Sequence, residues 1–331
     1  MKLRLLIITT LFFFQLHLLA DDYQLVWEDN FDGTTINTAY WNLEENARGG
    51  GNAEMQYYTP KNATIEKHPS SGESCLVISA IKEDYKNRPA TSARLNTQDK
   101  VVVQYGKIEA RIQLPHTANG LWPAFWMLGN DLIRDMGDDD SSDHHPQYYK
   151  NGFVAWPKCG EIDIVEMGHK DGITNGTQDR YFNGACHWGE SFNNGKYPNM
   201  GKSSVAPYTI QGDFHLFTVI WTPNEIAMYL DQDKYPNAKP YFSLSLKGKS
   251  KNQPGRYFNK PFYLVLNLSV GGYFTGLPAP EKYAKLITDD WENFVKITDT
   301  ALPKDGTPVK MYVDYIRIYQ QGTKNDKIIK P

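Results

Sequence analysis

The chain has 331 residues, of which 13% are aromatic, and a formal net charge of −3 at pH 7. A mildly acidic chain without a basic run excludes nucleic acid and anionic membrane surfaces as natural partners. The length allows two domains, but all-β sandwiches of nearly this size occur as one domain.

The N-terminus predicts a signal peptide over residues 1–20. A short basic start precedes an apolar stretch from Leu5 to Leu19 and the small residue Ala20. A membrane anchor is the alternative, but the stretch is short for a bilayer span and acids follow it. We therefore expect cleavage near Ala20, no stable membrane insertion, and a secreted or periplasmic protein without a lipid-anchor cysteine. Cleavage removes Lys2 and Arg4 and no acid, which leaves a net charge of −5.

Three cysteines are too few for a disulfide scaffold, so we expect buried free thiols at Cys75, Cys159 and Cys186. A bridge between Cys159 and Cys186 is the alternative.

Nearly every periodic segment of the chain alternates with period two, which predicts strands. Residues 105–114 alternate polar and apolar side chains, and residues 217–221 and 226–230 flank a turn containing Pro223. Residues 263–268 and 311–319 are β-branched or aromatic runs. The best helical candidate is short, over residues 280–286. Many strands joined by loops rich in Gly, Asn, Asp and Pro predict one all-β domain, a sandwich or barrel, over residues 21–331.

The segment from Gly129 to Gly160 has no apolar period, and it contains several Asp and His residues over 138–145. A metal site is conceivable there, but the spacing matches no ligand signature. We expect a solvated surface loop that helps to select the substrate.

The strongest chemical signal lies in residues 160–167. As a strand, Ile162 and Ile164 would face the core, and strict alternation would then bury Glu166. A β-bulge at Ile164–Val165 returns Glu166 to the face that carries Glu161 and Asp163. Crowded carboxylates raise one another's pKa, and glycoside cleavage needs one ionised and one protonated carboxyl group. A solvated acidic strand face is the bland alternative, which repulsion between the acids disfavours.

This acidic segment resembles the catalytic signature of glycoside hydrolase family 16, in its longer, bulged form. Other motifs match the family's laminarinase-like branch in order along the mature chain: residues 27–33, 52–58, 106–111, 120–127, 267–272 and 313–317. The resemblance implies a β-jelly roll of two curved antiparallel sheets with a concave substrate cleft. It also implies that Glu161 is the nucleophile, Asp163 the assisting acid and Glu166 the general acid/base.

The resemblance further implies which residues contact the sugar. Trp122 and Trp126 would be stacking platforms, Asn52 and Arg94 would contact hydroxyl groups, and His187 would lie near the leaving group. Core packing is the alternative for the tryptophans, and a structural role is the alternative for His187.

Family relatives often carry a structural calcium ion, which would be held here by Asp314, with Asn30 and Gly50 as carbonyl donors. Pairing of Asp314 with a nearby base is the alternative. No cofactor is expected for catalysis.

The sequence therefore predicts a monomeric endo-acting β-glucanase that retains configuration and cleaves β-1,3- or mixed-linkage β-1,3/1,4-glucan. The stretch Tyr273–Gly276 departs from the usual laminarinase pattern, so a hydrolase of agar- or porphyran-type galactans remains an alternative. A non-catalytic carbohydrate-binding jelly roll and a transglycosylase are further alternatives.

Overall fold

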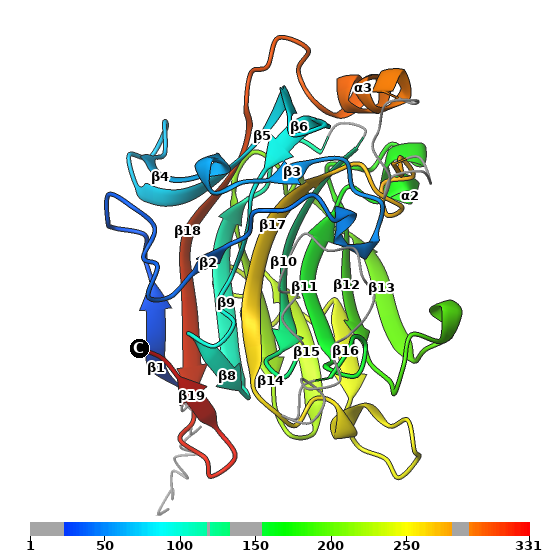
Figure 1. Cartoon of the computed structure of the whole chain (residues 1–331). Coiled ribbons are helices and arrows are strands. Elements are labelled where there is room, and N and C mark those ends of the chain that lie inside the picture. The colour runs from blue at the N-terminus through cyan, green and yellow to red at the C-terminus, as the bar shows by residue number, and fades with distance from the viewer. Residues whose placement is uncertain (1–22, 118–119, 133–153, 280–290) are drawn as a thin grey trace, which may run out of the picture.

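A computed structural model describes residues 23–117, 120–132, 154–279 and 291–331. These residues form two large sheets that pack face to face (Figure 1). The expected signal peptide, the expected short helix at 280–286 and most of the segment from Gly129 to Gly160 lie outside the described residues. Within the described part of the chain, no helix is long and apolar enough to cross a membrane.

The first sheet has ten strands, and its strands pair antiparallel except for β3 and β6. Its members are β1 (Gln24–Asp29), β3 (Tyr57–Tyr58), β4 (Ala63–Lys67), β5 (Ser74–Tyr85), β6 (Arg88–Ser92), β9 (Gly106–Gln113), β14 (Phe214–Trp221), β15 (Glu225–Leu230), β16 (Phe242–Ser245) and β18 (Val309–Gln320).

The second sheet has nine antiparallel strands and carries the acidic segment on an inner strand, β11. Its members are β2 (Asn42–Leu43), β7 (Arg94–Asn96), β8 (Val102–Gln104), β10 (Leu121–Gly129), β11 (Glu161–Met167), β12 (Tyr181–His187), β13 (Asn199–Val205), β17 (Phe262–Val270) and β19 (Lys327–Ile329). The helical elements are short: η1 (Gly49–Gly51), η2 (Pro60–Asn62), η4 (Asn193–Gly195), η5 (Pro254–Arg256), α2 (Lys170–Thr174) and α3 (Trp291–Ala301).

The strands expected from alternation are confirmed. β14 and β15 form the predicted hairpin, with Trp221 opposite Ile226. The segment predicted over 105–114 is β9, which lies between β14 and β18. Its polar face is less exposed to solvent than the alternation predicted. Glu109 is buried, and the other polar side chains of this face are half-buried: Lys107, Arg111 and Gln113.

Helix α3, which forms at Trp291–Ala301, was not expected from the sequence. Phe294, Thr298 and Ala301 are buried and lie on one face at helical spacing. The apolar residues of this segment recur at helical spacing, so this period was the available signal for the helix. The Thr298 hydroxyl is satisfied by the carbonyl of Phe294, at 2.8 Å.

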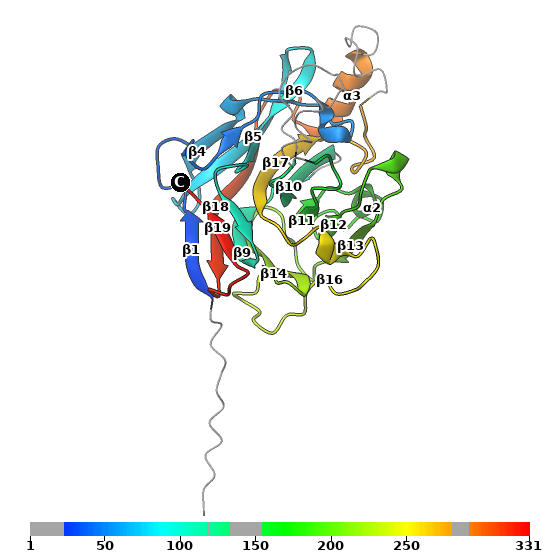
Figure 2. The same cartoon turned by 60° about the horizontal axis from the view of Figure 1, so that its bottom comes forward.

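The main core lies between the two sheets; Figure 2 shows both sheets with the bottom of the molecule turned forward. Ile108 and Ile112 enter it from β9, and Ile162 and Met167 enter it from β11. Full burial of each such side chain stabilises the fold by about 1.5–3 kcal/mol. All three cysteines are buried free thiols, as the sequence predicted.

The predicted bulge in β11 is confirmed. Asp163 pairs with Ala185 and Glu166 pairs with Asn183, so three steps along β11 match two along β12. Ile164 and Val165 are both fully buried in the core. The extra residue therefore keeps the apolar side chains inside and places Glu166 on the same outer face as Asp163.

A tyrosine that the sequence did not single out holds the bulge. Tyr241, which immediately precedes β16, is buried and donates its hydroxyl to the backbone carbonyl of Ile164. Its backbone N–H bonds the carbonyl of Met228 in β15, at 2.9 Å. The side chain therefore crosses the sandwich and satisfies the bulge carbonyl, which β11 leaves outside its ladder.

We predict that Tyr241→Phe lowers stability by about 1–3 kcal/mol, because the Ile164 carbonyl loses its buried donor. Activity should fall as well, since the bulge aims Glu166. Urea unfolding and turnover of the best substrate measure the two effects. Tyr208→Phe is the matched control, because it removes a hydroxyl bond to Asp231 beside the other sheet. A Tyr241→Phe protein with full turnover would contradict the link between bulge and site.

Candidate active site

Glu161, Asp163 and Glu166 project from the outer face of β11, between β10 and β12. The structure thus brings all three predicted acids together in one row. Asp163 is only 4% exposed and lies between the two glutamates in the strand. Each acid has a neighbour on β12: His187 opposite Glu161, Ala185 opposite Asp163 and Asn183 opposite Glu166.

Two indole N–H groups distinguish the two glutamates. Trp156 Nε1 donates to Glu161 Oε2 at 2.9 Å, and Trp122 Nε1 donates to Glu166 Oε1 at 3.1 Å. A donor of this kind favours the charged form of a carboxyl group. The glutamates therefore depend on different tryptophans, which lie on different segments of the chain.

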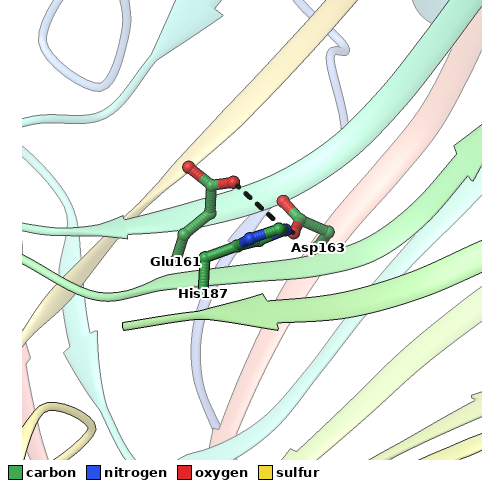
Figure 3. Close-up of side chains that lie close together, drawn as sticks. All are labelled: Glu161, Asp163 and His187. Carbon is green, nitrogen blue, oxygen red and sulfur yellow. Dashed lines mark ion pairs between the residues drawn. The ribbon is translucent and has the colours of Figure 1, made fainter. Parts of the chain in front are cut away.

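His187 closes the row of acids on the β12 side. Its Nε2 atom lies 3.3 Å from Asp163 Oδ2 and 3.9 Å from Glu161 Oε1. Figure 3 shows the three side chains pointing toward one another. The other ring nitrogen, Nδ1, meets the hydroxyl of Tyr197 at 3.1 Å. His187 is thus oriented by Tyr197 and placed to share a proton or a positive charge with the acids.

Burial raises the pKa of all three acids, and the charge of Asp163 raises the pKa of the two glutamates further. For Glu161, burial acts most, followed by the charge of Asp163, and together they raise the pKa from 4.5 to about 8. Burial also raises the pKa of Asp163. The pKa of Glu166 is raised well above its usual range by burial and then by Asp163. A site of this kind holds protons at neutral pH, as a general acid requires.

Two other predicted sugar contacts, Trp126 and Arg94, lie on the opposite side of β11 from His187. Trp126, on β10, is half-buried, and the Arg94 guanidinium lies 4.7 Å from its ring centre. Arg94 also pairs with Glu44, Nε to Oε1, at 3.0 Å. Asn52 is partly exposed beside η1 and accepts the backbone N–H of Tyr273 through its own carbonyl, at 2.9 Å.

Trp122 differs from an open stacking platform. It is 8% exposed, and the ring of Phe274 lies parallel to it at 4.6 Å. Phe274 belongs to the stretch that departs from the usual laminarinase pattern. The observed contacts give Trp122 a role in orienting Glu166 through its indole N–H.

Sequence reasoning missed Trp156 and a buried chain of hydrogen bonds behind Trp126. Trp126 Nε1 donates to Asn267 (2.7 Å), Asn267 donates to Ser269 (2.8 Å), and Ser269 meets the hydroxyl of Tyr58 (2.8 Å). The Tyr58 hydroxyl donates to buried Glu54 at 2.8 Å. The alternation of Asn267 and Ser269 on β17 was the available signal, since both polar side chains share one face.

Known proteins are similar to this chain in sequence and in architecture, although no family model matches it. A beta-glucanase of Rhodothermus marinus is 30% identical, over 91% of this chain and 86% of its own length. A glucan endo-1,3-beta-glucosidase A1 of Niallia circulans is also 30% identical, over 90% of this chain, which spans 38% of that relative.

Two solved structures extend the comparison. The catalytic domain of a laminarinase from Thermotoga petrophila is 33% identical, with a TM-score of 0.64, over 91% of this chain and 99% of its own. A Bacteroides ovatus glycoside hydrolase of family 16 is 29% identical, with a TM-score of 0.66, over 89% of this chain and all of its own. The chain belongs to glycoside hydrolase family 16. The jelly-roll fold and the laminarinase-like branch predicted for this hydrolase are thereby confirmed.

The calcium site expected for this family 16 hydrolase does not fit the predicted residues. Asp314 Oδ2 lies 2.6 Å from Arg111, so the alternative of an ion pair is confirmed. Asn30 follows β1, which pairs with β18, the strand of Asp314. Gly50 lies elsewhere, packed against Glu54, whose backbone pairs with Gly271 at the end of β17 in the other sheet. No calcium chemistry is therefore assigned to these three residues.

One group of three residues in the described part of the chain has the spacing of metal ligands, and it is Glu161, Asp163 and His187. Their candidate ligand atoms lie within 4.8 Å of one another. The same residues form the ion-pair cluster of the family 16 site, and the contacts of Glu161 and His187 with Trp156 and Tyr197 already account for their orientation.

We predict that this hydrolase loses stability as pH rises from the usual carboxyl range toward 8. The raised pKa values mean that the folded protein keeps protons that the unfolded chain releases, so their stabilising effect is lost over this window. Glu166→Gln cannot ionise, and it should unfold at a higher temperature than the wild type at pH 8 but at a similar one at pH 4. Thermal unfolding monitored by circular dichroism at both values tests this.

Glu225→Gln is the control for that experiment, because Glu225 is exposed in the turn of the β14–β15 hairpin. It should follow the pH dependence of the wild type. A Glu166→Gln protein that also follows the wild type at every pH would show that Glu166 ionises alike in both states.

Proposed function

We propose that the protein is an endo-acting hydrolase that cleaves β-1,3- or mixed-linkage β-1,3/1,4-glucan with retention of configuration. The observation that carries the proposal is the row of three crowded acids, with Asp163 buried and both glutamates half-buried, in which separate indole N–H groups hold the two glutamates. Carbohydrate binding alone does not require such crowding, since burying carboxylates together raises the free energy of the site. The names of the glucanase relatives support the choice of glucan.

The proposed reaction has two displacements. Glu161 attacks the anomeric carbon while Glu166 gives its proton to the departing glycosidic oxygen, which leaves a covalent glycosyl-enzyme. Glu166 then takes a proton from water, whose oxygen attacks the same carbon and releases Glu161. Both steps use only these two glutamates and water.

Asp163 and His187 support this exchange of charge. Asp163 lies between the glutamates, and it raises the pKa of both. His187 acts against Asp163, because it lowers the pKa of both glutamates. It thereby offsets the crowding of negative charge when Glu161 must ionise.

We further infer that the protein acts outside the cytoplasm after cleavage near Ala20, which the apolar start of the sequence supports. We also infer that it acts as a monomer.

The first test incubates the protein with laminarin, barley glucan and agarose and measures reducing ends. We expect oligosaccharides from one or both glucans. Product release from agarose alone would overturn the glucan assignment in favour of a galactan, a result that a keratan-sulfate endo-1,4-beta-galactosidase of Sphingobacterium multivorum, 24% identical, makes worth testing. Glu161→Gln should reduce the rate by several orders of magnitude.

Glu109→Gln is the control for that comparison, since Glu109 is a buried acid of the other sheet that pairs with Lys107 at 3.1 Å. Equal rates for Glu161→Gln and wild type would refute catalysis by this site. They would favour a binding module, as in the beta-1,3-glucan-binding protein of Penaeus monodon, 27% identical over 89% of this chain.

The two indole N–H groups predict separate effects on the pH profile. Trp156→Phe removes a donor to Glu161, so its pKa rises and the acidic limb of kcat/KM should move up by about one unit. Trp122→Phe removes a donor to Glu166, so its pKa rises and the basic limb should move up. The pH dependence of kcat/KM on one soluble glucan measures both. Shifts of the same limb in the two variants would contradict the assigned roles.

A further inference from the structure

The predicted sugar contacts are unevenly distributed about the catalytic strand. In the sheet order, β11 has β12 and β13 on one side and β10, β17, β7 and β2 on the other. Trp126 and Arg94 lie on β10 and β7, whereas His187 is the one predicted contact on β12. An endo-acting enzyme must hold sugar on both sides of the bond that it cleaves. This inference therefore rests on the proposed function and concerns the poorer side.

An aromatic cluster that sequence reasoning did not identify lies on that side, beside Glu161. Trp156 packs edge-on against Tyr197, with ring centres 4.8 Å apart, and Phe192 lies 5.7 Å from Trp156 and 5.8 Å from Tyr197. His187 completes the cluster at 6.0 Å from Trp156. One end of the cluster is bonded to Glu161 through the indole N–H of Trp156.

The other end of the cluster is open. Phe192 is 50% exposed, which is unusual for a phenylalanine held by two neighbouring rings. Tyr197 is half-buried, and its hydroxyl orients His187. The cluster therefore connects the carboxyl group of Glu161 to the exposed ring of Phe192 through contacts between neighbouring rings.

The loop that carries Phe192 and Tyr197 is fixed at both ends. It leaves β12 after His187 and returns at Asn199 of β13, and these two residues pair in the sheet. Asn193 and Asn194 have positive φ angles, which asparagine tolerates better than most residues, and they form the tight turn η4 next to Phe192. The turn follows Phe192 directly, and the exposed ring lies beside Trp156 and Tyr197.

We propose that Phe192 and Tyr197 form a sugar-binding subsite on the side of the scissile bond opposite Trp126 and Arg94. Its ligand is an uncharged hexopyranose unit of the polysaccharide, whose apolar ring face packs on Phe192. The Tyr197 hydroxyl, fixed by His187, meets the polar edge of the sugar. A loop that Phe192 merely stabilised would affect short and long substrates alike, and this difference separates the two explanations.

The test compares Phe192→Ala with the wild type on a ladder of oligosaccharides and on the parent polysaccharide. We expect kcat/KM on the polysaccharide to fall by about tenfold or more. The rate on the shortest cleaved oligosaccharide should be unchanged, and the product lengths should change. Phe192→Trp should keep the preference for long chains, because it keeps an aromatic face.

Tyr235→Ala is the matched control, since Tyr235 is also an exposed aromatic ring (51%) but follows β15 of the other sheet. It should leave the whole ladder unchanged. Equal losses on short and long substrates, or no loss on either, would overturn the subsite. A thermal unfolding curve for each variant identifies any general loss of folding.

The substrate that the wild type cleaves, whether glucan or galactan, is used for the ladder, so failure of the glucan assignment leaves this test intact. If the wild type cleaves neither, affinity electrophoresis in laminarin gels measures binding by the same variants. Weaker retardation of Phe192→Ala alone supports the subsite. A wild type that neither cleaves nor binds would overturn both proposals.

Discussion

Three carboxyl groups in six residues impose the constraint on which this molecule depends. Burial raises the pKa of each, and the charge of Asp163 adds to the effect on both glutamates, so the site remains functional only if one group can still ionise. The surrounding donors meet this need unequally: Trp156 supports Glu161, Trp122 supports Glu166, and His187 lies closest to Asp163. A symmetric environment would leave the two glutamates interchangeable, whereas the reaction needs them in opposite protonation states.

The bulge joins this electrostatic arrangement to the core. Without it, strict alternation would expose Val165 and bury Glu166 among aliphatic side chains. With it, Ile164 and Val165 both pack inside while Glu166 faces the substrate side. Tyr241 supplies the hydrogen bond that the displaced Ile164 carbonyl lacks, and it does so from a segment attached to the opposite sheet. Packing between the sheets is thus part of the catalytic geometry.

Local patterns in the sequence predicted most of the strands, the bulge and the acid triplet, because alternation and charge crowding operate over a few residues. They could not predict Tyr241, Trp156 or the chain from Trp126 to Glu54, since each joins segments that only the complete fold brings together. The prediction of Gly50 as a calcium ligand was wrong for the same reason, because a run of glycines does not indicate which sheet it will lie against. Helix α3 is a different case, because its apolar residues recur at helical spacing and a local pattern could have predicted it.

The loop between β12 and β13 begins and ends on two residues that are neighbours in the sheet, and none of the three acids belongs to it. The exposed residues 190–196 can therefore vary without moving the carboxyl groups, provided that Trp188 stays in the core and Tyr197 or an equivalent still orients His187. Evolution and protein engineering thus have a segment that can be exchanged as a unit. β11 supplies the carboxyl groups, while the exposed part of the loop between the paired residues His187 and Asn199 is where the proposed contacts with sugar can change independently.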